Sequence, residues 1–278
     1  MLREAGYEAR YRSTQDAWQE ALAWPADLVI AAGGDGTVAR VAAALLERGV
    51  PLGILPFGTA NNVAKALGIT RDGDAPTAAR AWAAARARPF DIWRVTVDGG
   101  TATFVESIGG GFLGRQIKAS LALEPPTLLL GNQMDRGLHL LRRAIAAEPE
   151  AHWGVELDGR DLSGRYIAVE ALNIRSVGPN LPLAPDADSG DGVIDLVLVS
   201  GAHRQQLELR LTSLATAREP EALRLPVLRG RELHLEPPQG IAFHLDGDTW
   251  EPEPVRADGT TPGMSITLAG QVKVLRPA

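Results

Sequence analysis

The sequence contains no cysteine, and this absence excludes several classes of site. None of the 278 residues is cysteine, so a disulfide scaffold, Cys-ligated zinc and a thiol nucleophile are ruled out. There is also no GxSxG pattern, which is the nucleophile elbow typical of serine hydrolases. The five histidines show no HxxxH or paired spacing for zinc; they are His139, His152, His203, His234 and His244.

Positive charge and long apolar runs are also scarce. The formal net charge is -6, which argues against a nucleic-acid partner because such proteins normally present a basic face. No apolar run approaches the roughly 20 residues of a membrane span, and the start of the chain does not resemble a signal peptide. We therefore expect a cytoplasmic protein.

The chain divides into two patterns of secondary structure near Pro89-Phe90-Asp91. Before this point short apolar strands alternate with helices, the rhythm of a parallel sheet. After it, period-2 alternation dominates, with a hairpin turn signal at Asp98-Gly99-Gly100. We predict an α/β domain over residues 1–90, to which 270–278 are a candidate to return, and a largely antiparallel β-sandwich over 91–269. The cleft between them is the expected site.

Individual elements follow from periodicity and turn residues. Strands are predicted at 27–30, 51–56, 92–97, 101–105, 152–157, 167–173, 193–199, 232–235, 241–245 and 265–268, and helices at 37–49, 61–67, 77–88, 134–147 and 204–217.

Two glycine-bearing turns are the strongest functional signal. The first is Gly33-Gly34-Asp35-Gly36-Thr37 and the second is Gly58-Thr59-Ala60-Asn61-Asn62. Each follows an apolar strand and opens a helix, where unpaired N–H groups and the positive end of the helix dipole favour an anion. Neither is a Walker A loop or a GxGxxG fingerprint. The pair predicts phosphate binding; ordinary tight strand-to-helix turns are the alternative.

Asp35 lies within the first of these turns. A carboxylate is a poor neighbour for nucleotide phosphates unless a cation lies between them, so Asp35 is predicted to organise Mg²⁺ against the γ-phosphate. The alternative is a carboxylate that caps the helix beginning after it.

These motifs resemble the diacylglycerol kinase catalytic-domain family, which includes bacterial lipid kinases and the sphingosine and ceramide kinases. The run 33–37 matches the family's GGDGT, and 58–62 is similar to its GTxND. Residues 107–112 resemble its SxGxG(F) region, 188–195 its divalent-metal DG loop, and 246–248 its Asp-Gly-Glu. Several such landmarks in the right order are more specific than any single one.

The resemblance implies a Rossmann-like N-terminal domain, of the NAD kinase and phosphofructokinase type, that binds ATP and Mg²⁺. The nucleotide contacts it implies are Thr14, Gly33, Gly34, Asp35, Gly36, Thr37, Gly58, Thr59, Asn61 and Asn62. It further implies a structural or regulatory metal held by Asp188, Asp191 and the Val193 carbonyl. An Asx-rich surface turn is the alternative for that loop.

The run Asp246-Gly247-Asp248 is the candidate acid pair. By resemblance Asp248 takes the proton from the substrate hydroxyl, and Asp246 has a supporting or alternative role. Where the family usually has Glu, Asp248 is one methylene shorter, and a displacement near 1 Å can cost about 10²-fold in rate. A simple Asp-Gly hairpin turn is the alternative.

The start of the chain departs from the family pattern. Family members begin with a strand and an Asn-Pro-x-Ser/Ala-Gly turn, which is absent here. We predict that residues 1–6 end the first helix and that 7–12 form the second strand, with Thr14 matching a family threonine near the nucleotide.

Together these observations predict ATP-dependent phosphoryl transfer to the hydroxyl of a lipid, such as diacylglycerol or a sphingoid base. The lipid would be reached by transient docking on the inner membrane face, through an apolar patch because the acidic balance gives no electrostatic help. Two alternatives stay open: an NAD kinase-like enzyme with a soluble acceptor, and a non-catalytic nucleotide- or lipid-binding relative. A homodimer is compatible with the sequence, which does not determine the oligomeric state.

Overall fold

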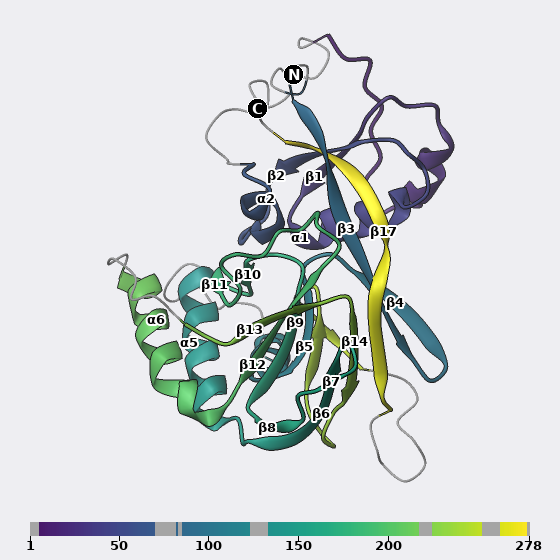
Figure 1. The fold of residues 1–278 in the computed structure, drawn as a ribbon. Coiled ribbons are helices and arrows are strands. Elements are labelled where there is room, and N and C mark those ends of the chain that lie inside the picture. Colours follow the sequence, from purple (N-terminus) through teal and green to yellow (C-terminus); the bar gives the residue numbers. More distant parts are fainter. Residues whose placement is uncertain are drawn as a thin grey trace.

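The computed structural model describes residues 6–69, 82, 85–122, 133–216, 224–251 and 262–276. Two lobes, one above the other in Figure 1, are joined by two long strands that run through both. The upper lobe holds a parallel pair of strands with helices, and the lower lobe is an antiparallel β-sandwich. The predicted fold class is therefore confirmed.

The N-terminal lobe is built on two adjacent parallel strands. Strand β1 (Val29–Gly33) pairs with β2 (Leu52–Pro56) over the whole length of both. Helix α1 (Asp35–Leu45) follows β1, and the short α2 (Asn62–Ala66) follows β2. The apolar stripe expected from the sequence makes the core contacts of α1, and its buried members are Val38, Val41, Ala42 and Leu45. A 3-10 helix, η1 (Trp18–Ala23), precedes β1.

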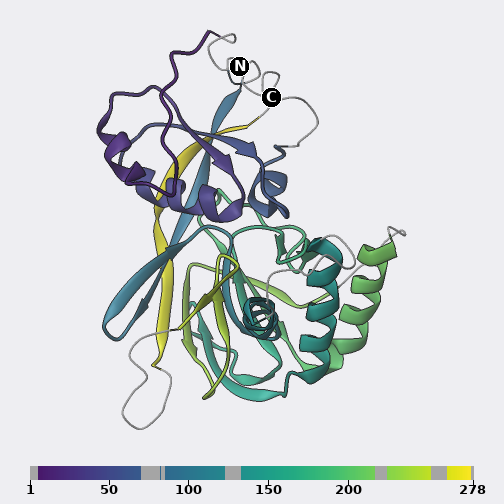
Figure 2. The same cartoon turned by 180° about the vertical axis from the view of Figure 1, so that it is seen from behind.

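Strands β3 (Arg86–Val97) and β17 (Met264–Arg276) connect the lobes (Figures 1 and 2). They pair antiparallel from Met264↔Val97 to Arg276↔Arg86, with a register shift between Leu268 and Gly270. In the upper lobe Val274 of β17 pairs parallel with Leu52 of β2. Consequently the expected division at residues 90 and 91 falls inside a continuous strand.

The C-terminal lobe consists of two sheets with helices on one outer face. One sheet continues from β17 through β14 to β6 and β7, and the other has the order β13-β12-β9-β5-β15-β16. Between them lies a core that includes the buried Trp93, Trp153 and Phe104. The strands are β4 (Gly100–Phe104), β5 (Ser107–Gly111), β6 (Ala151–Leu157), β7 (Arg160–Asp161), β8 (Gly164–Tyr166), β9 (Ala168–Leu172), β12 (Ile194–Val199), β13 (Val227–Gly230), β14 (Glu232–Glu236), β15 (Phe243–Leu245) and β16 (Asp248–Trp250).

The helices of this lobe pack against the second sheet through a separate apolar core. They are α4 (Phe112–Leu121), α5 (Gln133–Ala147), η2 (Gly201–His203) and α6 (Arg204–Thr216). A two-stranded hairpin of β10 (Ser176–Val177) and β11 (Leu181–Pro182) lies beside α2 of the other lobe (Figure 1).

Several predicted elements need correction. The helix expected at 77–88 is wrong at its end, because residues 86–88 pair with β17 as strand; residues 77–81, 83 and 84 lie outside the described residues. No strand forms at 7–12, although Tyr7 makes an edge-to-face contact with Trp82. Helix α4 was not expected, and the strand expected at 265–268 is much longer. The predicted hairpin turn at 98–100 is confirmed.

Candidate active site

The two glycine turns lie back to back at the carboxyl ends of β1 and β2. Phe57 N donates to Gly33 O at 2.9 Å. A Cβ atom at Gly58 would lie 2.4 Å from the Cα of Gly34 and 2.8 Å from Oδ1 of Asn61. Glycine is therefore required at position 58 because the two backbones touch. The turns form one surface, the phosphate cradle, defined by residues 33–37 and 58–62.

Side chains within the cradle fix its shape. Asp35 Oδ1 accepts the N–H of Val63 at 2.9 Å, so this carboxylate caps α2 rather than its own helix. Asn61, with φ at 50°, accepts from Gly58 N and donates to Gly58 O, both at 2.9 Å. Asn61 thus closes the second turn. Thr59 is exposed, and Thr37 N donates to Gly34 O at 3.0 Å.

Gly36 has a different surrounding from Gly34 and Gly58. It is exposed, and a Cβ atom added to it would meet nothing within 4 Å beyond its own helix. Packing therefore does not explain this glycine, whereas close approach of a ligand to the backbone would. Thr14 lies in the segment before η1 and is partly exposed.

Glu106, between β4 and β5, is a buried acid facing the cradle that was not among the predicted site residues. Its Oε1 accepts from Nδ2 of Asn62 at 3.1 Å, and the same amide nitrogen donates to Gly178 O at 3.0 Å. The residue is only 4% exposed. The sequence does contain a signal for Glu106: it is an acid within the apolar run that begins at Phe104. Because acids are almost never fully buried without a partner, an acid in such a run is a candidate functional residue.

Glu106 belongs to a cluster of three carboxylates from both lobes. Burial raises its pKa well above the ordinary value; the negative charges of Asp35 and Asp246 add to the rise, and hydrogen bonds from Asn62 and Gly178 oppose it. Hydrogen bonds place the acids near one another: Asp246 Oδ1 accepts the N–H of Glu106 at 2.7 Å, and Asp35 accepts that of Val63, the residue after Asn62. They come from α1, the β4–β5 connection and the β15–β16 turn.

One cation lies at the edge of this cluster. Lys65 of α2 donates from Nζ to Asn180 Oδ1 at 2.6 Å. Burial lowers the pKa of Lys65, and the negative charge of Asp35 opposes that effect. The Lys65 ammonium and the Asp35 carboxylate therefore attract each other.

Asp246 and Asp248 have distinct environments. Asp246 (φ 48°) and Gly247 (φ 79°) form a two-residue hairpin turn of the type I′ class. The Asp246 carboxylate accepts three backbone N–H groups, with Oδ1 at 3.1 Å from Val105 N, 2.7 Å from Glu106 N and 3.2 Å from Ser107 N. Asp248 is exposed as the first residue of β16.

The three hydrogen bonds from backbone N–H groups give Asp246 a structural role. Burial raises its pKa to about 6 despite these bonds, which act in the opposite direction. Asp246 is therefore a positioning residue that holds the β4–β5 connection, and Glu106 with it, against the hairpin turn. Its neighbour Asp248 keeps an accessible carboxylate.

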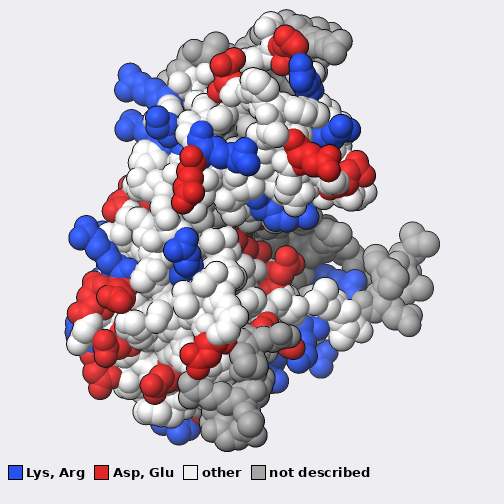
Figure 3. All heavy atoms as spheres, turned by 90° about the vertical axis from the view of Figure 1, so that its right-hand side faces the viewer, with Lys and Arg blue, Asp and Glu red and all other residues white. Residues whose placement is uncertain are grey.

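The space between the lobes is visible on the molecular surface. Figure 3 shows a hollow between the upper and lower lobes, with acidic side chains inside it and a basic side chain on its upper rim. Acidic side chains that gather in a hollow repel one another, and a bound cation would offset their charge.

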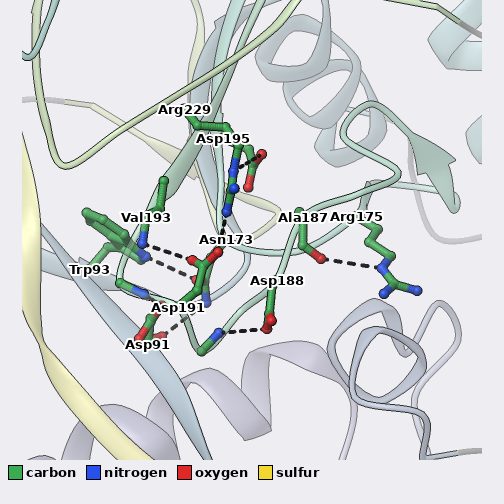
Figure 4. Close-up of polar contacts among 12 residues, drawn as sticks. Asp91, Trp93, Asn173, Arg175, Ala187, Asp188, Asp191, Val193, Asp195 and Arg229 are labelled. Carbon is green, nitrogen blue, oxygen red and sulfur yellow. Dashed lines mark hydrogen bonds and ion pairs between the residues drawn. The ribbon is translucent and has the colours of Figure 1, made fainter.

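The DG loop lies elsewhere, beside the strands that connect the lobes (Figure 4). Asp188 Oδ1 accepts from Gly190 N at 3.2 Å, and Asp191 Oδ1 accepts from Val193 N at 3.0 Å. The other oxygen of Asp191 is ion-paired with Arg229. Both carboxylates thus stabilise the loop itself, as in Asx turns.

Asp91 of β3 anchors this loop. It accepts from Gly192 N at 2.8 Å and from Nε2 of Gln271 at 2.7 Å. Asn173 joins the same region by donating to the Asp91 carbonyl at 3.0 Å while accepting from Trp93 Nε1, also at 3.0 Å. The loop is therefore fixed to both connecting strands.

The donor atoms of the cluster suit Mg²⁺ only in part. Within the described ranges, no group of three or more His, Asp or Glu side chains is arranged to hold a metal ion. Two hard oxygen donors lie here, the Asp35 carboxylate and the amide oxygen of Asn62. The Asn62 oxygen is buried and has no hydrogen-bond partner among the described residues. Mg²⁺ is usually held by one or two carboxylates together with substrate phosphates, so these residues fit a cation that arrives with a nucleotide.

The chain was compared with known protein families and solved structures. Residues 1–95 match the family described as "Diacylglycerol kinase catalytic domain", and 136–269 match the "YegS C-terminal NAD kinase beta sandwich-like domain". A crystal structure of a diacylglycerol kinase from Bacillus anthracis str. Sterne has the same fold, with a TM-score of 0.62 and 18% identity over 96% of this chain and 83% of that one.

Curated relatives agree with these matches. The "Diacylglycerol kinase" of Bacillus subtilis (strain 168) is 29% identical, covering 99% of this chain and 88% of the relative. The "Probable lipid kinase YegS-like" protein of Xanthomonas campestris pv. campestris (strain 8004) is 32% identical, covering 92% and 84%. In the part of the chain that the structure describes, no helix has the length and hydropathy of a membrane span. On these matches, the chain belongs to the diacylglycerol kinase catalytic-domain family of lipid kinases.

Proposed function

We propose that this protein transfers the γ-phosphate of ATP to the hydroxyl of a lipid such as diacylglycerol or a sphingoid base, in a reaction that depends on Mg²⁺. The observation that supports this most directly is that the acids Asp35, Glu106 and Asp246, from both lobes, are held by hydrogen bonds at and beside the phosphate cradle. A cradle for the phosphates and an acid that accepts the proton of the acceptor hydroxyl are two of the parts that such a transfer uses.

Each part of the site has a physical role. The N-terminus of α1 and the N–H groups of the cradle would bind and orient the phosphates. Mg²⁺, when bound, offsets the negative charge between the phosphates and the carboxylates. Asp35 is oriented toward this charge by its bond to Val63 N. Phosphoryl transfer depends largely on such positioning and electrostatics.

Asp248 is the proposed base for the acceptor hydroxyl. Its carboxylate is exposed, whereas the Asp246 carboxylate already accepts three N–H groups. The hairpin turn would therefore hold Asp246 in place and present Asp248 to the acceptor. Asp188, Asp191 and the Val193 carbonyl remain the proposed second metal site, in which the cation would compete with the Asp191–Arg229 ion pair.

The lipid would be reached at the membrane surface. Exposed apolar side chains available for docking include Phe57, immediately before the second turn of the cradle, and Leu121, at the end of α4; they are 55% and 70% exposed. A homodimer stays a prediction, which light scattering on the purified protein would measure.

The test is incubation of the purified chain with labelled ATP, Mg²⁺ and vesicles that contain one candidate lipid each. We expect a labelled lipid phosphate from the wild type and a loss of about 10²–10⁴-fold in Asp248→Ala. The matched control is Asp161→Ala, which removes an exposed hairpin acid in β7. A parallel reaction offers NAD as the acceptor. Transfer of the labelled phosphate to NAD, with no labelled lipid, would contradict the proposal.

A further inference from the structure

A small cavity lies between the two lobes, next to the phosphate cradle. It has a volume of about 100 Å³ and is lined by α2 of the N-terminal lobe and by the β10–β11 hairpin of the C-terminal lobe. The lining residues are Asn62, Lys65, Ala66, Arg175, Ser176 and Asn180. A buried water occupies about 10–15 Å³ of such space, so the cavity has room for a phosphate group.

Two cations from opposite lobes line this cavity. The Lys65 ammonium has three N–H groups, of which one donates to Asn180 Oδ1 at 2.6 Å. Nε of Arg175 donates to Ala187 O at 3.4 Å, and its terminal nitrogens make no hydrogen bond or ion pair within the described residues. Figure 4 shows this side chain extended away from the Asp188 carboxylate. A guanidinium with unused terminal N–H groups beside an ammonium favours an anionic ligand such as phosphate or carboxylate.

The charge around Arg175 is largely positive, although the chain has a net charge of -6. Burial lowers the pKa of Arg276 in β17; the positive charges of Arg88 and Arg175 add to this effect, and the negative charge of Asp188 opposes it. The three guanidinium groups therefore act on one another. Cations that gather in this way attract an anion to the surface between them.

The cavity is also lined by a buried acceptor that has no partner. The Asn62 side chain is buried, and its amide nitrogen already donates to Glu106 Oε1 and Gly178 O. Its Oδ1 has no hydrogen-bond partner within the described residues. A buried acceptor normally has a partner, so an occupant of the cavity must offer this oxygen a proton or, as in a complex with Mg²⁺, a cation.

This requirement separates phosphate from carboxylate. A phosphate monoester has a second pKa of about 6, so a fraction of it keeps an O–H group near neutral pH. A carboxylate has lost its proton there. Phosphate can therefore accept from the two cations and donate to Asn62, whereas a carboxylate can only accept.

We propose that the cavity binds a phosphate group with an ionisable O–H, held between Lys65 of one lobe and Arg175 of the other, at a site separate from the nucleotide phosphates. The bound group would bridge the lobes, because each cation comes from a different one. The inference goes beyond the proposed function and does not require a lipid acceptor. If the acceptor is a lipid, its product is a phosphate monoester of this class; free phosphate is the other source.

Calorimetric titration of the full chain with inorganic phosphate tests the site. The cradle is first filled with Mg²⁺ and a non-hydrolysable ATP analogue, and the ionic strength is held constant with chloride, which screens general attraction to a positive surface. We expect phosphate to bind to this complex. If the wild type binds no phosphate, or if the nucleotide analogue excludes it, the inference of a separate site is overturned.

Variants of the two cations place the bound phosphate. Lys65→Ala and Arg175→Ala should each lower the phosphate affinity by about 10–10²-fold, because each removes a charge-assisted hydrogen bond. Both side chains are exposed, so we expect the variants to fold. The matched controls are Lys118→Ala, an exposed lysine of α4, and Arg88→Ala, a neighbouring arginine that does not line the cavity; both should stay within about fivefold of the wild type. Wild-type affinity in both cavity variants, or an equal loss in Arg88→Ala, would overturn the inference.

Further probes identify the ligand chemistry and its source. Acetate should bind at least about tenfold more weakly than phosphate, because it leaves the Asn62 oxygen without a donor; equal binding would overturn the assignment to phosphate. Dihexanoyl phosphatidic acid, kept below its micelle concentration, is then compared with inorganic phosphate. Tighter binding of the lipid phosphate that is lost in Arg175→Ala supports the site with a lipid phosphate as its ligand, and equal binding supports it with free phosphate. Binding of both probes that is unaffected by Arg175→Ala would overturn it.

The site and the proposed function fail in different ways. If the purified chain labels no lipid, the proposed function is wrong, while the phosphate titrations still test the cavity. If lipid is labelled but phosphate binding does not depend on Lys65 and Arg175, only the inference about the cavity is wrong.

Discussion

Replacing Gly36 with alanine should have opposite effects on the stability of the fold and on nucleotide binding. A Cβ atom at this position meets nothing within 4 Å beyond the helix itself, so the substitution introduces no clash. Gly36 is the second residue of α1, and alanine is favoured over glycine in a helix by about 0.5–1 kcal/mol. We therefore expect Gly36→Ala to raise the free energy of unfolding by about that amount.

The same substitution should weaken nucleotide binding. If phosphates lie against the backbone at the start of α1, the added methyl group occupies the space that they need, and a displacement near 1 Å costs about 10²-fold in rate. Urea unfolding measures the first effect, and calorimetric titration with ATP and turnover measure the second. Gly137→Ala in α5 is the control, because its Cβ would make only ordinary contact with Pro179 at 3.4 Å. A stabilised Gly36→Ala with wild-type ATP affinity would refute the reasoning.

Three further substitutions test the framework around the site. Gly109→Ala would place a Cβ 2.1 Å from Glu170 Oε2, so we expect a loss of roughly 1–3 kcal/mol from overpacking; an unchanged urea midpoint would contradict the packing. Asp91→Ala leaves the Gly192 N–H without its acceptor and should cost about 1–3 kcal/mol, whereas equal stability would mean that the DG loop is not anchored there. Burial raises the pKa of Asp195 from 3.8 to about 6, so the folded state binds this proton more tightly than the unfolded state and loses stability as pH rises from about 4 to about 6. Asp195→Asn should remove that part of the pH dependence of unfolding, and the same dependence in both proteins would contradict it.

Local patterns predicted the local backbone structure around the candidate site. The glycine turns open α1 and α2 because each follows a buried strand, and the 3.6-residue stripe through Val38 and Leu45 identifies the buried face of α1. The Asp246-Gly247 turn also follows from its sequence, because Asp-Gly is a preferred pair for a type I′ turn, in which both residues have positive φ, as they do here. For these features a short window of sequence contains the physical cause.

Other features depend on contacts between distant segments. Glu106 becomes a site residue only because Asn62 and Gly178 reach it from other parts of the chain. The role of Asp246 depends on N–H groups about 140 residues away in sequence. The length of β17 was hidden because the register shift near Gly270 interrupts its alternation. No local pattern encodes such partners.

The central claim is that one site is shared by the phosphate cradle and the acids of the other lobe. A crystal structure of the chain with Mg²⁺ and a non-hydrolysable ATP analogue tests it most directly. The account predicts that the phosphates contact the backbone of residues 33–37 and that the terminal phosphate faces Glu106 and the β15–β16 hairpin. Nucleotide bound elsewhere, or a terminal phosphate directed away from the hairpin, would contradict it.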